Sequence, residues 1–539
     1  MIGLGYGNPA RFLLGGFEPR RSFACPREKG GIDGRVKSKP KVSEVLEGLE
    51  VLARHGKEDG IVTDLCMDSR RVSPGAVFFA LPGFRTNGTH FIEEAIDRGA
   101  IAVVAETAHR PNPQVAYFQV KDARLAMAQV ARRFFREPDE TLAVHAITGT
   151  NGKTTVTYLV RFLSAAAGKK SGMVGTIDYD LGARTVPSFR TTPESIDLYG
   201  MLAQMVAAGC TEVAMEASSH GIDQHRLHGL HCRTATFLNL TRDHLDYHQD
   251  MDNYFRVKAR LFTGENGSVP EVAVMNADDP KTATLREMLS PDTRAITFGE
   301  ADGADIRATE IEMQPQGTSL RLTWPEGTAK IRSPLIGRYN VSNVLAAVGI
   351  LYGRGLDLWH VLPHISRFEG VPGRMQKIEA GQDFSVLVDY AHTDDALRNA
   401  LEMLRTITPG KVRVVFGCGG NRDRSKRPAM TRVALNLADQ VWATSDNPRK
   451  EKVEDIFADM RTAVGKSEGE RITFLEDRRQ AISAALDAAE PGDCVLIAGK
   501  GHETFQEFGD TVLPFDDRQV AAELLQIKTY RKGAGEDGG

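Results

Sequence analysis

The sequence predicts an α/β protein made of several domains, each built on a parallel sheet. The chain has 539 residues, too many for one hydrophobic core, so we expect about two to four domains. Short apolar runs of β-prone residues alternate with stretches of helical periodicity, which is typical of parallel strands joined by crossover helices. A glycine-rich turn stands between one such run, residues 142–147, and the helical pattern after it.

This turn has the residue types that hold the phosphates of a nucleotide. It consists of Gly149, Thr150, Asn151, Gly152, Lys153, Thr154 and Thr155. The helical face after it has apolar residues at i, i+3, i+4 and i+7: Val156, Leu159, Val160 and Leu163. A turn at a helix N-terminus directs backbone N–H groups at an anion, and the helix dipole favours negative charge there. We therefore expect ATP as a ligand, with Lys153 at the outer phosphates and the Thr154 hydroxyl on Mg²⁺, although Ile147 stands where the general GxxxxGK[ST] pattern has its first glycine.

Composition excludes several classes of protein. Lys and Arg number 67 and Asp and Glu 71, a formal charge of −4, so no overall basic field recruits nucleic acid. No apolar run approaches the roughly 20 residues of a membrane-spanning helix. The six cysteines are scattered without a CxxC pair, which argues against a zinc ribbon or a disulfide framework. We expect a cytoplasmic protein that neither binds nucleic acid nor inserts into a membrane.

Residues 1–41 differ from the rest of the chain. They contain nine Lys or Arg, only three Asp or Glu, and many Gly and Pro, which predicts a disordered basic tail. An Arg-rich, acid-poor arm also fits a targeting peptide, but Phe12-Leu13-Leu14 is too short for the apolar region of a secretion signal. We favour a dispensable extension.

Three sections follow the tail, at residues 42–138, 139–371 and 372–539. The first has predicted strands at 76–81 and 100–104 and a helix near 91–98. The second has predicted strands at 142–147, 213–216, 236–239 and 272–276. The third has predicted strands at 386–389, 412–417, 441–444 and 495–499. Ligands of parallel sheets lie beyond the carboxyl ends of the strands, so polar residues at these ends are site candidates.

Glu216 ends one of these strands and is the first such candidate. A carboxylate there can bind Mg²⁺ beside the phosphate loop, and the alternative is an ordinary solvated residue at a strand end. Residues 239–248 are rich in His and Asp, including His244, but their spacing matches no zinc signature. From spacing alone, both a metal site and a surface loop remain open for this segment.

Eight segments occur in a fixed order along the chain: GTNGKTT (149–155), EASSHG (216–221), TRDHLDYH (241–248), NADD (276–279), GRYNVSN (337–343), GRM (373–375), DYAHT (389–393) and GKGHE (499–503). Together they resemble the Mur ligase family, ATP-dependent enzymes that form amide bonds in peptidoglycan precursor synthesis. The resemblance extends from about Asp68 to Arg518. It implies the three-domain Mur ligase architecture: a uridine-binding N-terminal α/β domain, a central P-loop ATPase-like domain with a parallel sheet, and a C-terminal Rossmann-like domain.

Within this family, residues 446–449 resemble the DNPR motif of members that add meso-diaminopimelate to UDP-N-acetylmuramoyl-L-alanyl-D-glutamate. Diaminopimelate differs from lysine by one extra carboxylate, which an arginine can bind through two parallel hydrogen bonds. From the residues alone, an Asn-Pro pair after a strand also fits a turn. The resemblance implies that the amino acid is held by Arg422, Asp446, Asn447, Pro448, Arg449, Gly499 and Glu503. Glu503 is expected at its distal ammonium group.

The resemblance also assigns the other substrates. The UDP part is expected at Met67, Ser69, Phe84, Arg85 and Thr86. The muramoyl dipeptide is expected at Thr191, Thr192, Ser218, Gln224 and Arg226. Asn276 is expected at the adenine of ATP, and Asn340 and Arg374 near its phosphates.

Lys258 matches a lysine that is carbamylated in this family, although its surroundings in the sequence alone suggest an ordinary solvated helix lysine. A carbamate formed with CO2 converts the cation into an anion that can help to hold Mg²⁺. The implied catalytic residues are Lys153, Glu216, His244 and Lys258. The implied ligands of two Mg²⁺ ions are Thr154, Glu216, His244 and carbamylated Lys258. The chain departs from the family at Asp394, where proline is usual, and at Phe84, where a polar residue is common.

In the implied reaction, ATP phosphorylates the D-Glu side-chain carboxylate, and an amine of diaminopimelate then attacks the acyl phosphate. The expected partners are these small-molecule substrates, and we expect a monomer. One alternative is a sister ligase, either a folylpolyglutamate synthase, which shares the GTNGKT loop, or a Mur ligase that adds lysine. The other is an NTP-binding scaffold without catalysis. The DNPR motif argues against both sister ligases, and the complete set of phosphate and metal residues argues against the scaffold.

Overall fold

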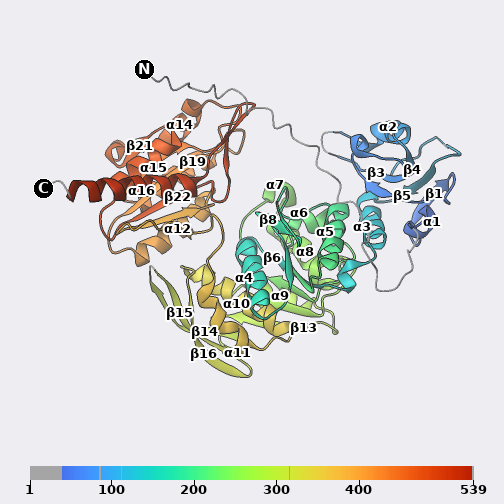
Figure 1. Ribbon diagram of the computed structural model, residues 1–539, viewed down its shortest axis with the longest axis horizontal. Coiled ribbons are helices and arrows are strands. Elements are labelled where there is room, and N and C mark those ends of the chain that lie inside the picture. Colours follow the sequence, from blue (N-terminus) through green and yellow to red (C-terminus); the bar gives the residue numbers. More distant parts are fainter. Residues whose placement is uncertain (1–38, 84–85, 111, 315, 537–539) are drawn as a thin grey trace, which may run out of the picture.

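The chain folds into three α/β domains, each built around its own main sheet (Figure 1). This computed structural model describes residues 39–83, 86–110, 112–314 and 316–536. Most of the predicted tail, residues 1–38, and the predicted uridine contacts Phe84 and Arg85 lie outside the described residues. Figure 1 shows the first domain, in blue, and the third, in orange to red, on opposite sides of the central domain.

The first domain has a sheet of five strands in the order β1-β5-β4-β3-β2, in which only β1 is antiparallel to its neighbour. The strands are β1 (Val51–His55), β2 (Asp64–Cys66), β3 (Ala76–Ala80), β4 (Ala100–Ala105) and β5 (Ala116–Val120). The helices are α1 (Val42–Val45), α2 (Ile92–Asp97) and α3 (Ala123–Phe134). The predicted strands at 76–81 and 100–104 and the predicted helix near 91–98 are therefore confirmed. Helix α3 packs against α5 (Ser195–Ala207), and one hydrophobic core continues from this domain into the central one.

The central domain has an eleven-stranded sheet in the order β16-β15-β14-β13-β12-β11-β6-β10-β7-β8-β9. Its strands are β6 (Ala143–Thr148), β7 (Ser171–Val174), β8 (Asp178–Asp180), β9 (Thr185–Pro187), β10 (Glu212–Glu216), β11 (Thr234–Phe237), β12 (Val272–Asn276), β13 (Arg294–Gly299), β14 (Ile306–Gln314), β15 (Gly317–Trp324) and β16 (Gly327–Ser333). Its helices are α4 (Lys153–Ala166), α5, α6 (Ser219–Asp223), α7 (Leu245–His248), α8 (Met251–Thr263), α9 (Lys281–Glu287), α10 (Arg338–Gly353) and α11 (Leu358–Val361).

The predicted parallel sheet is confirmed for the inner strands and is wrong at both edges. Strands β7, β10, β6, β11, β12 and β13 are parallel, so their carboxyl ends meet at one side of the sheet. Strands β8 and β9 at one edge, and β15 and β16 at the other, pair in antiparallel fashion. Only residues 325–326 separate β15 from β16, and such a short connection leaves no room for a crossover helix.

The third domain has a six-stranded sheet in the order β17-β18-β22-β19-β20-β21, antiparallel only at β17. Its strands are β17 (Gln376–Lys377), β18 (Ser385–Asp389), β19 (Val412–Cys418), β20 (Gln440–Ser445), β21 (Ile472–Phe474) and β22 (Cys494–Ala498), with a separate hairpin of β23 (Phe505–Phe508) and β24 (Thr511–Pro514). Its helices are α12 (Asp394–Ile407), α13 (Lys426–Leu437), α14 (Val453–Arg461), α15 (Arg478–Asp487) and α16 (Asp517–Glu536). Two cores cover the two faces, one with α12, α13 and α14 and the other with α15 and α16. All four strands predicted for this domain are confirmed.

The cysteines of the described residues, Cys66, Cys210, Cys232, Cys418 and Cys494, are all buried and form no disulfide. None of the helices within the described residues combines the length and the apolar character needed to cross a membrane.

Candidate active site

The phosphate loop connects the end of β6 to the start of α4, as predicted. Gly152, the residue before α4, has a φ of 90°, in the left-handed region that favours glycine. A Cβ at this position would lie 2.3 Å from Oδ1 of Asn343 on α10, so a side chain would also collide there. Helix α10 therefore closes one side of the loop.

Asn239, which lies just beyond the end of β11, holds the loop in place. Its side-chain carbonyl accepts hydrogen bonds from the backbone N–H groups of Thr150 (3.1 Å) and Asn151 (2.9 Å). The hydroxyl of Thr150 in turn donates to the carbonyl of Thr241 (3.2 Å). The start of the His- and Asp-rich segment is thus part of the phosphate-loop structure.

Two lysine ammonium groups meet at the carbonyl oxygen of Gly149. Lys153 Nζ lies 2.9 Å from this oxygen and Lys258 Nζ lies 3.1 Å from it. Lys258, on α8, is 1% exposed, and its ammonium lies 4.5 Å from the centre of the Tyr254 ring. Burial lowers the pKa of Lys258 well below its usual value, and the charge of Lys153 lowers it further. The interpretation of Lys258 as a solvated lysine, drawn from its sequence surroundings alone, is therefore wrong.

Glu216 lies at the carboxyl end of β10, beside β6, and Thr176 fixes its carboxylate. One carboxylate oxygen accepts the backbone N–H of Thr176 (2.7 Å), and the other accepts its hydroxyl (3.0 Å). Glu216 is 1% exposed, so the alternative of a solvated strand-end residue is wrong. Burial lowers the pKa of Lys153, and the charge of Glu216 opposes that change. The carboxylate therefore acts electrostatically on the lysine of the phosphate loop.

His244 stands next to this region, immediately before α7, and it is exposed. Its ring centre lies 4.9 Å from that of His220, and its Nε2 lies 3.4 Å from a carboxylate oxygen of Asp243. Among the residues that the structure describes, no three His, Cys, Asp or Glu side chains are grouped so as to hold a metal ion by themselves. Mg²⁺ needs no such group, because one or two carboxylates, substrate phosphates and waters complete its octahedron. The buried hydroxyl of Thr154 and the carboxylate of Glu216 fit that requirement.

The residues expected at the muramoyl dipeptide form one hydrogen-bonded patch beside Glu216. They are Thr191, Thr192, Ser218, Gln224 and Arg226. The Thr192 hydroxyl donates to the backbone carbonyl of Glu216 (2.9 Å) and accepts from the Ser218 hydroxyl (3.0 Å). Arg226 donates to the carbonyl of Thr192 (2.8 Å) and to the side chain of Gln224 (2.7 Å). The hydroxyl of Thr191 is hydrogen-bonded to that of Thr176 (3.1 Å), which also binds the Glu216 carboxylate. The structure therefore brings all five residues together beside Glu216.

The residues expected at ATP come from two further elements. Asn276 ends β12 and donates its side-chain amide to the carbonyl of Leu238 (2.8 Å). Asn340, on α10, accepts a hydrogen bond from the side-chain amide of Asn343 (2.9 Å). Asn343, which contacts the phosphate loop, was absent from the predicted site. Its position three residues after Asn340, on the same face of a helix, was the signal that could have found it.

Arg374, near the start of the third domain, lies within electrostatic range of the phosphate loop. Its guanidinium lies 4.7 Å from the centre of the Tyr390 ring, and its charge contributes to the lowered pKa of Lys153, whose main cause is burial. Burial raises the pKa of Tyr390, and the charge of Glu503 raises it further. Tyr390, which follows β18, thus lies between residues expected at ATP and residues expected at the amino acid. The prediction missed it, although its place at a strand end was a usable signal.

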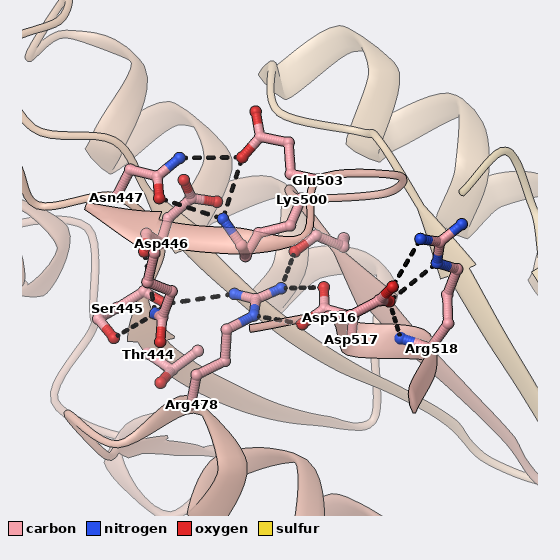
Figure 2. Close-up of polar contacts among 12 residues, drawn as sticks. Thr444, Ser445, Asp446, Asn447, Arg478, Lys500, Glu503, Asp516, Asp517 and Arg518 are labelled. Atoms are coloured by element: carbon pink, nitrogen blue, oxygen red, sulfur yellow. Dashed lines mark hydrogen bonds and ion pairs between the residues drawn. The ribbon is translucent and has the colours of Figure 1, made fainter. Parts of the chain in front are cut away.

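The residues expected at diaminopimelate follow the ends of three neighbouring strands, β19, β20 and β22. Asn447 donates from its side chain to the carboxylate of Glu503 (2.9 Å), as Figure 2 shows. The ammonium of Lys500 lies between them, 3.1 Å from Oδ1 of Asn447 and 3.0 Å from Glu503, and this lysine is fully buried. Lys500 was absent from the predicted site, although it lies within the GKGHE segment.

The two predicted arginines both lie close to Gly419, just after β19. A Cβ at Gly419 would meet Nη1 of Arg449 at 3.1 Å and Cγ of Arg422 at 3.7 Å. Arg449 donates to the carbonyl of Gly420 (3.0 Å) and pairs with Glu507 (3.2 Å). Gly499, with a φ of 111°, lies so close to Asp446 that a Cβ would be 2.9 Å from its carboxylate. Pro448 is buried between Asn447 and Arg449, which completes the predicted set.

The described residues expected at the UDP part lie in the first domain. Ser69 is 5% exposed, and its hydroxyl donates to the carboxylate of Glu94 (2.8 Å). Met67 is half-buried and Thr86 is exposed. Their assignment to uridine stays a prediction.

Asp394, where the family usually has proline, is the first residue of α12. The hydroxyl of Thr393 accepts the backbone N–H of Ala396 (3.2 Å) and caps the helix. Aspartate and proline both suit the first turn of a helix, so the departure leaves the helix start in place.

Comparison with known proteins matches nearly all of the described chain. Family models match residues 62–135 (Mur ligase family, catalytic domain), 147–351 (Mur ligase middle domain) and 373–501 (Mur ligase, glutamate ligase domain). A UDP-N-acetylmuramoyl-L-alanyl-D-glutamate–2,6-diaminopimelate ligase from Solibacter usitatus is 44% identical over 471 residues, which cover 87% of this chain and 95% of that protein. One of the same name from Geobacillus thermodenitrificans is 43% identical over 477 residues, with 88% and 96% covered.

Solved structures give the same result. A structure of a UDP-N-acetylmuramoyl-L-alanyl-D-glutamate–2,6-diaminopimelate ligase is 34% identical, with a TM-score of 0.68 over 91% of this chain and 99% of that chain. A UDP-N-acetylmuramoylalanyl-D-glutamyl-2,6-diaminopimelate–D-alanyl-D-alanyl ligase from Acinetobacter baumannii is 20% identical, with a TM-score of 0.60 over 92% and 100%, and so shares the fold.

Proposed function

The chain belongs to the Mur ligase family of ATP-dependent ligases, and we propose that it joins meso-diaminopimelate to the D-Glu side chain of UDP-N-acetylmuramoyl-L-alanyl-D-glutamate in peptidoglycan precursor synthesis. The observation that carries this proposal is that Arg422 and Arg449 meet at Gly419, after β19, while Asn447 and Glu503, which follow the neighbouring strands β20 and β22, are hydrogen-bonded to each other. Arginine guanidinium groups suit the carboxylates of diaminopimelate, and the carboxylate of Glu503 suits its ammonium. The names of the similar proteins support diaminopimelate as the amino acid that is added.

The chain's own residues account for the first chemical step. Lys153 and the N–H groups of residues 149–155 bind the transferring phosphate and neutralise the charge that develops on it. The dipeptide is held by the patch of Thr191, Thr192, Ser218, Gln224 and Arg226. The hydrogen bond from Thr192 to the backbone carbonyl of Glu216 places this patch beside the phosphate loop. The D-Glu carboxylate attacks the γ-phosphate of ATP, ADP leaves, and an acyl phosphate forms.

The second step needs the amine of diaminopimelate at that acyl phosphate. Arg422, Arg449 and Glu503 orient the amino acid, and attack by the amine forms the amide and releases phosphate. Positioning of the reactants does most of the work, because fixing two reactants can supply roughly 7–11 kcal/mol of the barrier.

We assign the binding of ATP to Asn276, Asn340 and Arg374, with Asn276 at the adenine.

We assign Mg²⁺ to Thr154, Glu216 and His244, with Lys258 as a carbamate. Bound Mg²⁺ supplies positive charge to the phosphate oxygens. Lys258 suits carbamylation because it is buried beside the loop and burial favours the neutral amine, the form that reacts with CO2.

The remaining assignments concern the whole chain. We place the domain boundaries at 138/139 and 371/372, and the gaps between the family models, at 135–147 and 351–373, support them.

We assign the UDP part of the substrate to Met67, Ser69, Phe84, Arg85 and Thr86. We propose a cytoplasmic monomer, in keeping with the unpaired cysteines of the described residues.

Phosphate release with each amino acid tests the proposed function. With ATP, Mg²⁺ and the UDP-dipeptide present, we expect meso-diaminopimelate to support release and L-lysine to give only the background measured without any amino acid. The reason is that lysine leaves the arginines without their second carboxylate. Equal release with lysine would keep the ligase and reject the acceptor assignment. No release with either would reject the proposed reaction.

Domain closure gives a second prediction. The substrates are assigned to all three domains, so we expect the third domain to close on the central one when nucleotide and UDP-dipeptide bind, excluding the water that would hydrolyse the acyl phosphate. Small-angle scattering should show a smaller radius of gyration with both ligands. The Lys153→Ala variant, whose nucleotide site is impaired, should not compact. An unchanged radius for the wild-type protein would contradict closure.

A further inference from the structure

Arg478, the first residue of α15, is a buried cation next to the loops assigned to meso-diaminopimelate. It is 1% exposed, and its side chain and that of Asp517, the first residue of α16, are both fully buried. Figure 2 shows the contacts between these two side chains. Two parallel hydrogen bonds join them, from Nε and from Nη2, each 2.7 Å long. The carboxylate therefore fixes the plane of the guanidinium group.

The same guanidinium also contacts the ends of two strands. Nη1 donates to the carbonyl of Ser445, the last residue of β20 (3.3 Å), and Nη2 donates to the carbonyl of Ala498, the last residue of β22 (2.9 Å). Four hydrogen bonds thus occupy a side chain with five N–H donors. Strands β20 and β22 are not neighbours, because β19 lies between them. Arg478 therefore bridges the end of β20 and the end of β22, two strands that do not pair with each other.

The residues that follow these two carbonyls are assigned to the amino acid. Asp446 and Asn447 come directly after Ser445, and Gly499 comes directly after Ala498. The spacing between the two strand ends is tight, since a Cβ on Gly499 would lie 2.9 Å from the carboxylate of Asp446. Burial lowers the pKa of Arg478, but Asp517, Asp446 and Glu503 raise it, with a net rise. The guanidinium charge therefore acts on two carboxylates of the acceptor site as well as on its own partner.

We propose that Arg478, oriented by Asp517, is a positioning residue for the amino-acid acceptor: it sets the distance between the β20 and β22 loops to which meso-diaminopimelate is assigned. It touches no substrate and acts through Asp446, Asn447 and Gly499. This inference rests on the proposed function, in which those loops bind the amino acid.

A second buried ion pair in the same sheet supplies a matched control. Arg413, near the start of β19, pairs with Asp493, which precedes β22, and their side chains are both 3% exposed. This pair lies at the amino ends of the strands, away from the loops assigned to the amino acid. Breaking either pair leaves a buried charge uncompensated and should lower the melting temperature. Only a change in the Arg478 pair should also raise the KM for meso-diaminopimelate.

The test compares Arg478→Lys with Arg413→Lys, and adds Asp517→Asn, which keeps the shape of the partner but removes the charge that compensates the buried guanidinium. A lysine keeps the charge but cannot bind the carboxylate and both carbonyls in one plane. For Arg478→Lys we expect the KM for meso-diaminopimelate to rise about tenfold or more, the loss expected for hydrogen bonds to a charged group, with the KM values for ATP and the UDP-dipeptide within about twofold. Asp517→Asn should shift the same KM in the same direction, because the guanidinium loses the carboxylate that orients it.

The outcomes separate positioning from stability alone. A raised KM for diaminopimelate in Arg478→Lys and Asp517→Asn, with an unchanged one in Arg413→Lys, supports the proposal. Equal changes in the Arg478 and Arg413 variants, or a lowered melting temperature without any change of KM, would overturn it. Should Arg478→Lys fail to fold, Asp517→Asn decides alone. Failure of the wild-type protein to use diaminopimelate would reject the proposed function instead, a result already visible before any variant is compared.

Discussion

Replacing Lys258 by alanine should reduce phosphate release by about 100- to 1,000-fold, the loss typical of removing one charge-stabilising group at a reacting centre. The structure gives the reason, because the Lys258 ammonium shares the carbonyl of Gly149 with Lys153 and is buried beside the phosphate loop. As a carbamate, this side chain would present an anion to Mg²⁺, and the alanine variant lacks that anion. A small carboxylate such as acetate should therefore restore part of the activity, because it can occupy the vacated space. The measurement is the rate of phosphate release with and without added acetate.

Two controls make this result specific. Lys281→Ala removes a lysine that pairs with Asp252 at the surface and packs over the Phe255 ring, and it should leave the rate within about twofold, as for other exposed ion pairs. Lys258→Met fills the space with a neutral chain and should be as inactive as Lys258→Ala but without rescue. Full activity of Lys258→Ala would reject any role for this lysine. Loss of activity without rescue by acetate would reject the carbamate and leave Lys258 as an ordinary cation.

Replacing Arg449 by lysine should raise the KM for meso-diaminopimelate by about 10- to 100-fold while the KM for ATP stays nearly constant, because the bidentate contact is lost and the charge is kept. Arg449 is held in place by the carbonyl of Gly420 and by Glu507, so its guanidinium is oriented before the amino acid arrives. A lysine cannot reproduce this planar arrangement. Steady-state kinetics with each substrate varied in turn provides the measurement.

Arg424→Lys is the matched control for this prediction. Arg424 lies two residues after Arg422 and pairs with Asp459 on the surface, where the exchange for lysine should have little effect. An equal rise in the KM for ATP and for diaminopimelate in Arg449→Lys would show a general disturbance of the domain. An unchanged KM for diaminopimelate would remove Arg449 from the acceptor site.

Local sequence patterns predicted most of the inner strands and the phosphate loop. The run at 142–147 became β6, and the predicted strands of the third domain became β18, β19, β20 and β22. Each is a short apolar run whose neighbours in the chain already settle its conformation. The antiparallel edges, such as β15 and β16, were missed because strand direction depends on connection length and on pairing partners, which periodicity does not report.

The candidate site divides in the same way. Glu216 and Asn276 could be identified as candidates because they end apolar strands, and parallel strands bring such ends together. Thr176 could not, since nothing near it in the sequence shows that it binds both oxygens of a carboxylate forty residues further along the chain. Arg478 is a similar case, because its partner Asp517 begins another helix, 39 residues further along the chain.

By itself, the sequence determined the family, the phosphate loop and most of the inner strands, and it indicated candidate residues for ATP, the UDP-dipeptide and the amino acid. Only the tertiary structure decided that Lys258 faces inward to the carbonyl of Gly149, that Arg374 meets Tyr390, and that Arg478 joins the ends of β20 and β22. The physical reason is the range of the forces involved. Propensity and periodicity act between residues a few positions apart, whereas burial, ion pairing and hydrogen bonding between distant segments depend on which strands lie side by side.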